Sequence, residues 1–325
     1  FVKNDWVWVD IHCRPRDVKY LVKWWSGAKA SAPTLEVKKR KGRRDCSFRL
    51  RFAYEEYRDL SLRDEPLDRR LALAVDLGIN NDAVCSVMAA DGAILGRRFI
   101  NFPREKDRMN HLLNKQRGEQ RDHGRYGGRR TWDQINNLND QLSANIARAI
   151  VDMAVEHGVN VILFEALDFH GRIRGRKAQR LHLWRKRAIQ DMVEHKAHRN
   201  LIRISRVCAW GTSRLAFDGS GEILRGRVNL TNDELAALIA METKDRKKAK
   251  GRPETHCGQE RCTFLNGKEY NCDLSASYNI GARYFLREWC KVTPGLEETL
   301  PKTTQRTYAN LKALKPQHSY RKAAA

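Results

Sequence analysis

The chain has 325 residues, which suggests about two domains at roughly 150 residues per domain. Hydrophobic residues make up 41% of it and charged residues 31%, which is typical of a globular protein and excludes one that is disordered throughout. No apolar run approaches the ~20 residues that a membrane-spanning helix needs, so no membrane partner is predicted. Lysine and arginine number 62 against 39 acidic residues, and the resulting net charge of +23 predicts binding to a polyanion such as nucleic acid.

Eight cysteines lie along the chain without the regular spacing of a disulfide framework, and no hydrophobic leader precedes them. This usage predicts a reduced, cytoplasmic setting. The first residue is Phe1 rather than Met, and the residues after it already look like the approach to a strand. We therefore expect a fragment, or a set of joined segments, of a longer protein.

Residues 1–56 are predicted to form a β module. Apolar and polar positions alternate in short bursts, and aromatic and β-branched residues are frequent; the bursts are residues 7–9, 20–22 and 48–52. Residues 57–70 are polar and contain Pro66, which is typical of a linker. The sequence thus predicts a small sheet or barrel followed by a connection to a second region.

From Leu71 onward the pattern predicts an α/β region over residues 71–207. A continuous apolar run ends at Asp76, and two further apolar segments follow it across tight turns, which indicates three antiparallel strands. No element is predicted in the polar, basic segment that follows. The remaining segments of this region are predicted in the order helix, strand, helix, strand; they are residues 132–153, 159–164, 189–197 and 201–204.

The C-terminal third is predicted to be less regular. Residues 208–272 are basic without a clear period, residues 273–291 show helical spacing, and residues 292–325 read as a basic, loosely held tail. Within the α/β region, residues 171–187 contain many lysines and arginines and no acid. This run follows Glu165 directly, so we expect a mobile lid over a site there; a solvated charged surface is the alternative.

Three acidic residues follow or begin predicted elements. Asp76 and Glu165 are each the first acid after a buried strand, where parallel neighbours would bring both carboxylates to one edge of the sheet. Asp273 opens the last long helix. Three carboxylates on three rigid elements suit two magnesium ions that hydrolyse a phosphodiester. Taken singly, each strand-ending acid is more typical of a turn, and Asp273 is more typical of a helix N-cap.

The motifs around these acids resemble the three RuvC motifs of the TnpB family and the related type V CRISPR effectors, the Cas12 class. The matching segments are residues 75–81 (VDLGINN), 162–167 (ILFEAL) and 273–280 (DLSASYNI). Residues 211–214 (GTSR) are similar to the Thr-Ser element that precedes the target-nucleic-acid-binding insertion of that family. The resemblance spans about residues 71–290.

The resemblance implies an RNase H-like (RuvC) core with a mixed sheet, preceded by a β-barrel-like wedge (OB) module. It implies a zinc-ribbon-like insertion over residues 208–272. It further implies an RNA-guided DNA endonuclease with guide RNA and target DNA, duplex and single-stranded, as partners. In that class base pairing reads the target sequence. Asp76, Glu165 and Asp273 would be the catalytic residues, holding two Mg²⁺, and Arg214 would hold the scissile phosphate, with a structural salt bridge as the alternative.

The chain departs from the family at two places. The third motif usually reads Asp-x-Asn-Ala-Ala-x-Asn-Ile, whereas Ser275 and Ser277 stand here at the first Asn and the second Ala. The first Cys-x-x-Cys after the Thr-Ser element is missing. Cys257, Cys262 and Cys272 are the candidate zinc ligands, with His256 or Cys208 as a fourth, and buried free thiols are the alternative.

The sequence thus favours an RNA-guided DNA endonuclease. Two alternatives stay open. One is an unguided RNase H-like nuclease, such as a resolvase or a transposase. The other is an RNA-guided DNA-binding protein that no longer cleaves because its third motif has drifted.

Overall fold

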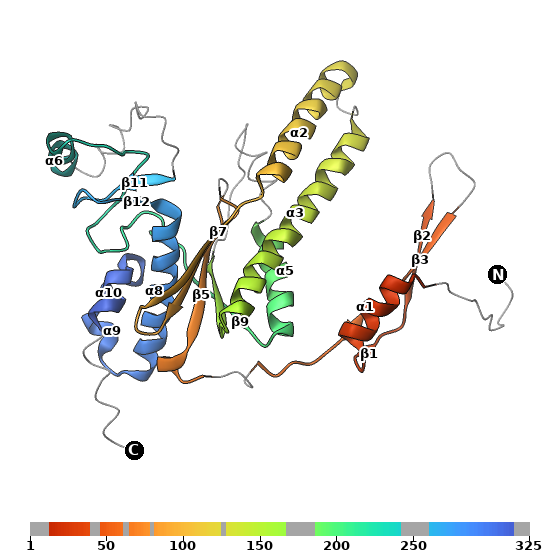
Figure 1. Ribbon diagram of the computed structural model, residues 1–325, viewed down its shortest axis with the longest axis horizontal. Helices are drawn as coiled ribbons and strands as arrows, with labels where there is room; N and C mark the ends of the chain where they lie inside the picture. Colours follow the sequence, from red (N-terminus) through yellow and green to blue (C-terminus); the bar gives the residue numbers. More distant parts are fainter. Residues whose placement is uncertain are drawn as a thin grey trace. The chain divides into compact units, whose positions relative to one another are not determined.

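The computed structural model describes residues 13–39, 46–60, 65–78, 81–124, 128–166, 186–241 and 260–314. The chain divides into two compact units, Phe1–Asp59 and Leu60–Ala325, and the predicted linker spans the point of division. None of the helices among the described residues is both long and apolar enough to cross a membrane. Figure 1 shows the elements of each unit.

The first unit contains one helix and two short antiparallel ladders. Helix α1 (Pro15–Trp25) precedes the strand pairs, which are β1 (Lys29–Ala30) with β4 (Tyr54–Glu55) and β2 (Thr34–Lys39) with β3 (Cys46–Arg51). The predicted strand at residues 48–52 is confirmed by β3. The predicted strand at residues 20–22 is wrong, because Pro15 starts a helix whose apolar Val18, Leu21, Val22 and Trp25 follow helical spacing. The predicted strand at residues 7–9 lies outside the described residues.

A five-stranded mixed sheet forms the centre of the second unit. Its strands stand in the order β7-β6-β5-β8-β9, with β5, β6 and β7 antiparallel and β8 and β9 parallel to β5; their bounds are Leu71–Asp76 (β5), Ala83–Ala89 (β6), Ile94–Ile100 (β7), Val161–Ala166 (β8) and Arg203–Cys208 (β9). The short helix η2 (Leu67–Arg69) leads into β5. The predicted order of strands and the mixed α/β class are thereby confirmed.

Helices cover both faces of this sheet (Figure 1). On one face, apolar residues of α3 (Arg129–Glu156) and α5 (Lys186–Arg199) pack against Leu73, Val75 and Phe164. On the other face, α8 (Cys272–Val292) packs against Ala72 and Ala74. The sheet residues alternate between the two faces, as the period of two along a strand requires.

Helix α2 (Pro103–His123) was not predicted. It carries few apolar residues, and only Met109, Leu112 and Leu113 pack inward, against Ile135 and Leu138 of α3. A helix that packs on a single neighbour needs only this narrow stripe, so its periodicity is weak in the sequence.

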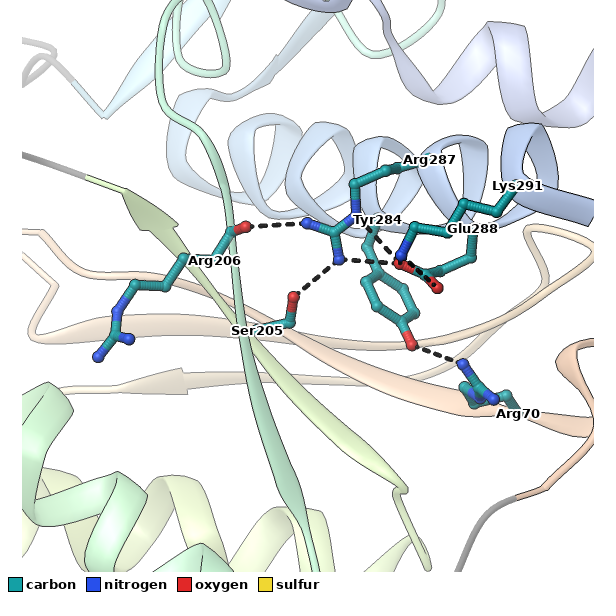
Figure 2. Close-up of polar contacts among 7 residues, drawn as sticks. All are labelled: Arg70, Ser205, Arg206, Tyr284, Arg287, Glu288 and Lys291. Atoms are coloured by element: carbon teal, nitrogen blue, oxygen red, sulfur yellow. Dashed lines mark hydrogen bonds and ion pairs between the residues drawn. The ribbon is translucent and has the colours of Figure 1, made fainter. Parts of the chain in front are cut away.

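Helix α8 lies close to the sheet and contacts it in its middle and toward its C-terminal end. At Gly281, a Cβ atom would come within 3.4 Å of the Ala74 Cβ and within 2.8 Å of the Met88 Cε, so glycine permits this approach. Further along, Arg287 donates to the Arg206 carbonyl at 3.1 Å and to the Ser205 hydroxyl at 2.9 Å (Figure 2). In the same view, Arg70 donates to the Tyr284 hydroxyl, and Lys291 holds the Glu288 carboxylate.

The predicted irregular region contains a three-stranded antiparallel sheet of β10 (Leu224–Arg225), β11 (Arg261–Thr263) and β12 (Glu269–Asn271), with helix α6 (Asn232–Ala240) between the first two strands in sequence. The prediction of a loosely held tail is wrong for residues 292–314. The tail forms α9 (Leu296–Thr299), η4 (Thr303–Gln305) and α10 (Tyr308–Ala313), and Leu296 and Leu311 are buried in the core on the α8 side. Residues 315–325 lie outside the described part of the chain.

Candidate active site

Asp76 and Glu165 lie side by side at the ends of two parallel strands. Ala74 of β5 stands opposite Leu163 of β8, so Asp76 and Glu165, each two residues further along, are level with one another. Because alternate residues of a strand face the same side, both carboxylates face the side that α8 covers. Both residues are buried, with exposed fractions of 7% and 6%.

Asp273 joins these two acids from the first turn of α8. The N-cap of this helix is Asn271, whose side chain accepts a hydrogen bond from the Leu274 amide at 2.9 Å. The alternative in which Asp273 caps the helix is therefore wrong, and its carboxylate faces other partners. Since α8 packs across β5, its N-terminus brings Asp273 close to Asp76 at the end of β5.

The charges of the three carboxylates act on one another. Burial raises the pKa of Asp76 well above its ordinary value, and the neighbouring charges of Glu165 and Asp273 raise it further. Lys186 and Arg225 oppose this rise but do not cancel it. The site therefore concentrates negative charge in a buried place, which is the condition that favours binding of a divalent cation.

Glu165 is held by two side chains that the sequence reasoning missed. The Thr212 hydroxyl is hydrogen-bonded to the Glu165 Oε1, and the Lys186 ammonium donates to the Oε2 at 3.3 Å. Thr212 belongs to the Thr-Ser element, and Lys186 begins α5 with only 7% of its surface exposed. The Gln190 side chain also donates to the Glu165 carbonyl at 3.4 Å.

Asp273 has its own pair of partners. The Asn81 side-chain amide donates to the Oδ2 at 3.3 Å, and the Arg225 guanidinium lies 3.8 Å from the Oδ1. Asn81 approaches because Gly78 has no side chain: a Cβ there would stand 2.7 Å from the Asn81 carbonyl oxygen. The turn after β5 thus connects the first motif with the third.

The donor set fits hard cations, because all three predicted ligands offer carboxylate oxygens. However, no three His, Cys, Asp or Glu side chains among the described residues are arranged so that they could hold one metal ion together. Instead, Glu165 and Asp273 each contact one cation and one neutral donor of the protein. Binding of Mg²⁺ would require these carboxylates to exchange Lys186 and Arg225 for the ions, whereas the neutral donors could stay.

Helix α8 also fixes the segment that carries Thr212. The buried Asn279 side chain donates to the carbonyls of Thr212 and Leu215, at 3.0 and 2.8 Å, and accepts from the Tyr308 amide. The buried Arg283 guanidinium donates to four carbonyls; these belong to Cys208, Trp210, Thr304 and Arg306. One helix therefore positions Asp273 directly and Glu165 through Thr212.

Arg214, the predicted phosphate ligand, is engaged within the protein. Its guanidinium lies 2.5 Å from the Glu222 carboxylate and 5.8 Å from the centre of the Trp210 ring. This is the salt bridge that the sequence left open as an alternative. The cations that lie next to the acids are Lys186 and Arg225 instead.

Two of the three predicted zinc ligands lie together. The Cys262 and Cys272 thiols are buried and hydrogen-bonded to each other, and this bond is the largest cause that raises the pKa of Cys262 and lowers the pKa of Cys272. Cys208 is exposed at the end of β9. Cys257 and His256 lie outside the described residues, so zinc binding stays a prediction. Of the predicted lid, residues 171–185 also lie outside the described residues, so the lid stays a prediction as well.

The chain is similar in sequence to a protein of the family that its three acidic motifs resemble. No model of a known protein family matches the chain. A TnpB-like protein of Aquifex aeolicus (strain VF5) is 27% identical to it over 38% of the chain, and the match covers 47% of that protein. The chain therefore spans about half the length of the curated relative.

Two solved structures are similar over 82% of the chain at 18% identity. One is a Cas12f1–sgRNA–target DNA complex, with 48% of that chain covered and a TM-score of 0.47. The other is a CRISPR-Cas12f ternary complex, with 47% covered and a TM-score of 0.38. The sequence match therefore shows similarity to a TnpB-like protein, which is a member of the family that the three acidic motifs resemble.

Proposed function

We propose that the chain carries the nuclease site of an RNA-guided DNA endonuclease, and that this site hydrolyses phosphodiester bonds with two Mg²⁺. The observation that carries the proposal is the meeting of Asp76, Glu165 and Asp273 from two parallel strands and a helix at one edge of one sheet. The strand order and the position of α8 support an RNase H-like core of the RuvC type.

Asp76, Glu165 and Asp273 would hold the two ions. When bound, such ions lower the pKa of an attacking water and stabilise the leaving oxygen. The protein's part is to fix the three carboxylates: Thr212 orients Glu165, and Asn81 orients Asp273. Lys186 and Arg225 limit the repulsion among the acids, and both cations lie where a nucleic-acid phosphate would add negative charge.

The positive net charge of the chain and its similarity to a TnpB-like protein support nucleic acid as the partner. A net charge of +23 favours binding to a polyanion, which would relieve the self-repulsion of the protein. The resemblance of the three motifs to the TnpB and Cas12 proteins, together with the similarity to a TnpB-like protein, supports guidance by RNA, with base pairing selecting the DNA and the protein binding its backbone. The substrates would be target duplex and the single strands that pairing displaces.

Cleavage assays test the proposal. The chain is purified with the RNA that it retains, and DNA matching that RNA is incubated with it in Mg²⁺. We expect Asp76→Asn, Glu165→Gln and Asp273→Asn each to abolish cutting, because each removes one ligand charge. RNA-dependent DNA binding should persist in all three variants. Asp133→Asn, an exposed acid of α3, is the matched control and should cut normally.

The same assay separates the rival enzymes. Cleavage of structured DNA without RNA would support an unguided nuclease, resolvase or transposase. Unchanged cutting by Asp76→Asn would overturn the site altogether.

A second candidate function is RNA-guided DNA binding without cleavage. Two observations favour it: no three acidic, Cys or His side chains of the described part form a ready metal cluster, and serines replace two residues of the third motif. Guided binding by the wild type, with no cutting in Mg²⁺ or Mn²⁺, would establish this function.

A further inference from the structure

A half-exposed aromatic ring lies in the same row of the sheet as Asp76. Asp76 stands opposite Val84 of β6, and Val84 stands opposite Phe99 of β7. Residues directly opposite one another face the same side of a sheet, so Phe99 faces the α8 side, as Asp76 does. Two strand spacings separate the two residues, which amounts to about 10 Å.

Phe99 is open to a partner because β7 is the edge strand. Helix α8 packs over β5 and β6, with Val84 buried beneath it, whereas Phe99 keeps 48% of its surface exposed. The Phe99 ring can therefore contact a partner beside the buried acidic site.

Arg97 adds a positive charge to the same face. It stands opposite Ser86, which in turn pairs with Ala74. Arg97 therefore lies on the same face as Phe99, two residues before it on β7. Its guanidinium is stacked 5.5 Å from the centre of the Tyr278 ring of α8, and this contact fixes the charge over the α8 side. Arg98, its neighbour, faces the opposite side and pairs with Glu156 of α3 at 2.8 Å.

We propose that Phe99 and Arg97 form a binding subsite for a single strand of nucleic acid next to the three carboxylates. A base would stack on the Phe99 ring and a phosphate would contact Arg97. The strand would then continue along the sheet toward Asp76. Stacking on an aromatic ring is tolerant of sequence, which suits a protein whose sequence selection rests on base pairing. This subsite rests on the proposed nuclease function, since it places substrate at that same site.

Binding of a single-stranded DNA oligonucleotide by the full chain, in the presence of a chelator, tests the subsite without cleavage. Single strands lose affinity with salt at a slope of about 0.7 per phosphate contact. Arg97→Gln should therefore lower the slope of log affinity against log salt by about 0.7. Arg98→Gln removes the same charge from the same strand on the other face, and should leave the slope unchanged.

Phe99→Ala should weaken binding by about fivefold or more, as expected for loss of one stacked base. Phe99→Trp should restore affinity, and Phe99→Leu, which keeps an apolar surface without a ring, should not. Leu95→Ala, an exposed apolar residue of the same strand, is the control. Photo-crosslinking of DNA that carries 5-iodouracil should mark the peptide with Phe99.

Equal effects of the two arginine variants, together with no crosslink at Phe99, would overturn the subsite. So would a change of oligomeric state in Phe99→Ala with normal DNA binding, since the ring would then contact a second protein chain. Failure of the nuclease function looks different: wild type would not cut in Mg²⁺, while the contrast between Arg97→Gln and Arg98→Gln would remain.

Discussion

At the scale of single residues, the site depends on neighbours that keep each carboxylate in place. Glu165 lies between a neutral hydroxyl and an ammonium group, and Asp273 between an amide and a guanidinium. Each acid thus has one neutral donor that can stay in place when cations bind. Thr212 is that donor for Glu165.

Replacing Thr212 by valine tests this role. The change keeps the shape and removes a hydrogen bond to a charged group, a contribution of about 1.5–3 kcal/mol. We expect the cleavage rate to fall by about tenfold or more. Thr212→Ser keeps the hydroxyl and should keep most of the activity. Equal activity of the valine and wild-type proteins would show that the hydroxyl does not position Glu165.

Asp76 predicts a pH dependence of stability. Burial, together with the charges of Glu165 and Asp273, raises its pKa in the folded protein above the unfolded value. The folded state then holds the proton more tightly, so this contribution is full below the unfolded pKa and is lost as pH rises through the folded pKa. In chelator, thermal stability should therefore fall toward neutral pH less in Asp76→Asn than in wild type. Parallel curves for the two proteins would contradict the burial of a charged Asp76.

The acids could be predicted from sequence because each one follows or begins a strongly patterned element. Lys186, Thr212 and Arg225 could not be assigned to them, because they reach the site from segments with no local signal of contact. The Thr-Ser element is recognisable through family resemblance, but its contact with Glu165 forms only when β8 and β9 pair and the turn after β9 is folded. The Arg214 salt bridge to Glu222 likewise depends on the turn between them.

At the scale of elements, α8 is the part on which the site depends most. It carries Asp273 at its start and the buried Asn279 and Arg283 in its middle. Toward its end, it contacts β9 and the residue that precedes β5, Arg70. The serines of the third motif fit this role as well. Ser275 accepts a hydrogen bond from the Phe217 amide, and Ser277 donates to the Leu274 carbonyl.

Asn279→Ala should destabilise the protein strongly. It removes two donated hydrogen bonds and one accepted bond at a fully buried position, which leaves backbone groups without partners. We expect a loss of about 2–4 kcal/mol in the free energy of unfolding, measured by denaturant titration. Asn137→Ala, at an exposed position of α3, should change it by less than about 0.5 kcal/mol. Similar small losses in both variants would refute the bridging role of Asn279.

Elements with a strong period were predictable, and those with weak or mixed periods were not. The buried strands and the long helices α3 and α8 have continuous or helically spaced apolar residues. Helix α1 was mistaken for a strand because three successive residues, Tyr20, Leu21 and Val22, favour β structure locally. The tail was mistaken for a loose end because its short helices α9 and α10 are fixed by packing on α8 rather than by their own sequence.

At the scale of the whole molecule, charge and fold both support the proposed function. Positive charge is spread along the chain, whereas the acids that matter are buried at one edge of the central sheet. A polyanion is thus attracted by the surface and meets concentrated negative charge only where metal ions would be held. This division of charge suits the proposed metal-dependent nuclease.

Binding of Mn²⁺, measured by electron paramagnetic resonance on the full chain and on Asp76→Asn, Glu165→Gln, Asp273→Asn and the control Asp133→Asn, tests the central claim most directly. The account predicts that the wild type and the control bind two ions and that each of the three site variants binds fewer or binds them far more weakly. Undiminished Mn²⁺ binding in Asp273→Asn would contradict it, because the three carboxylates would then not share one metal site.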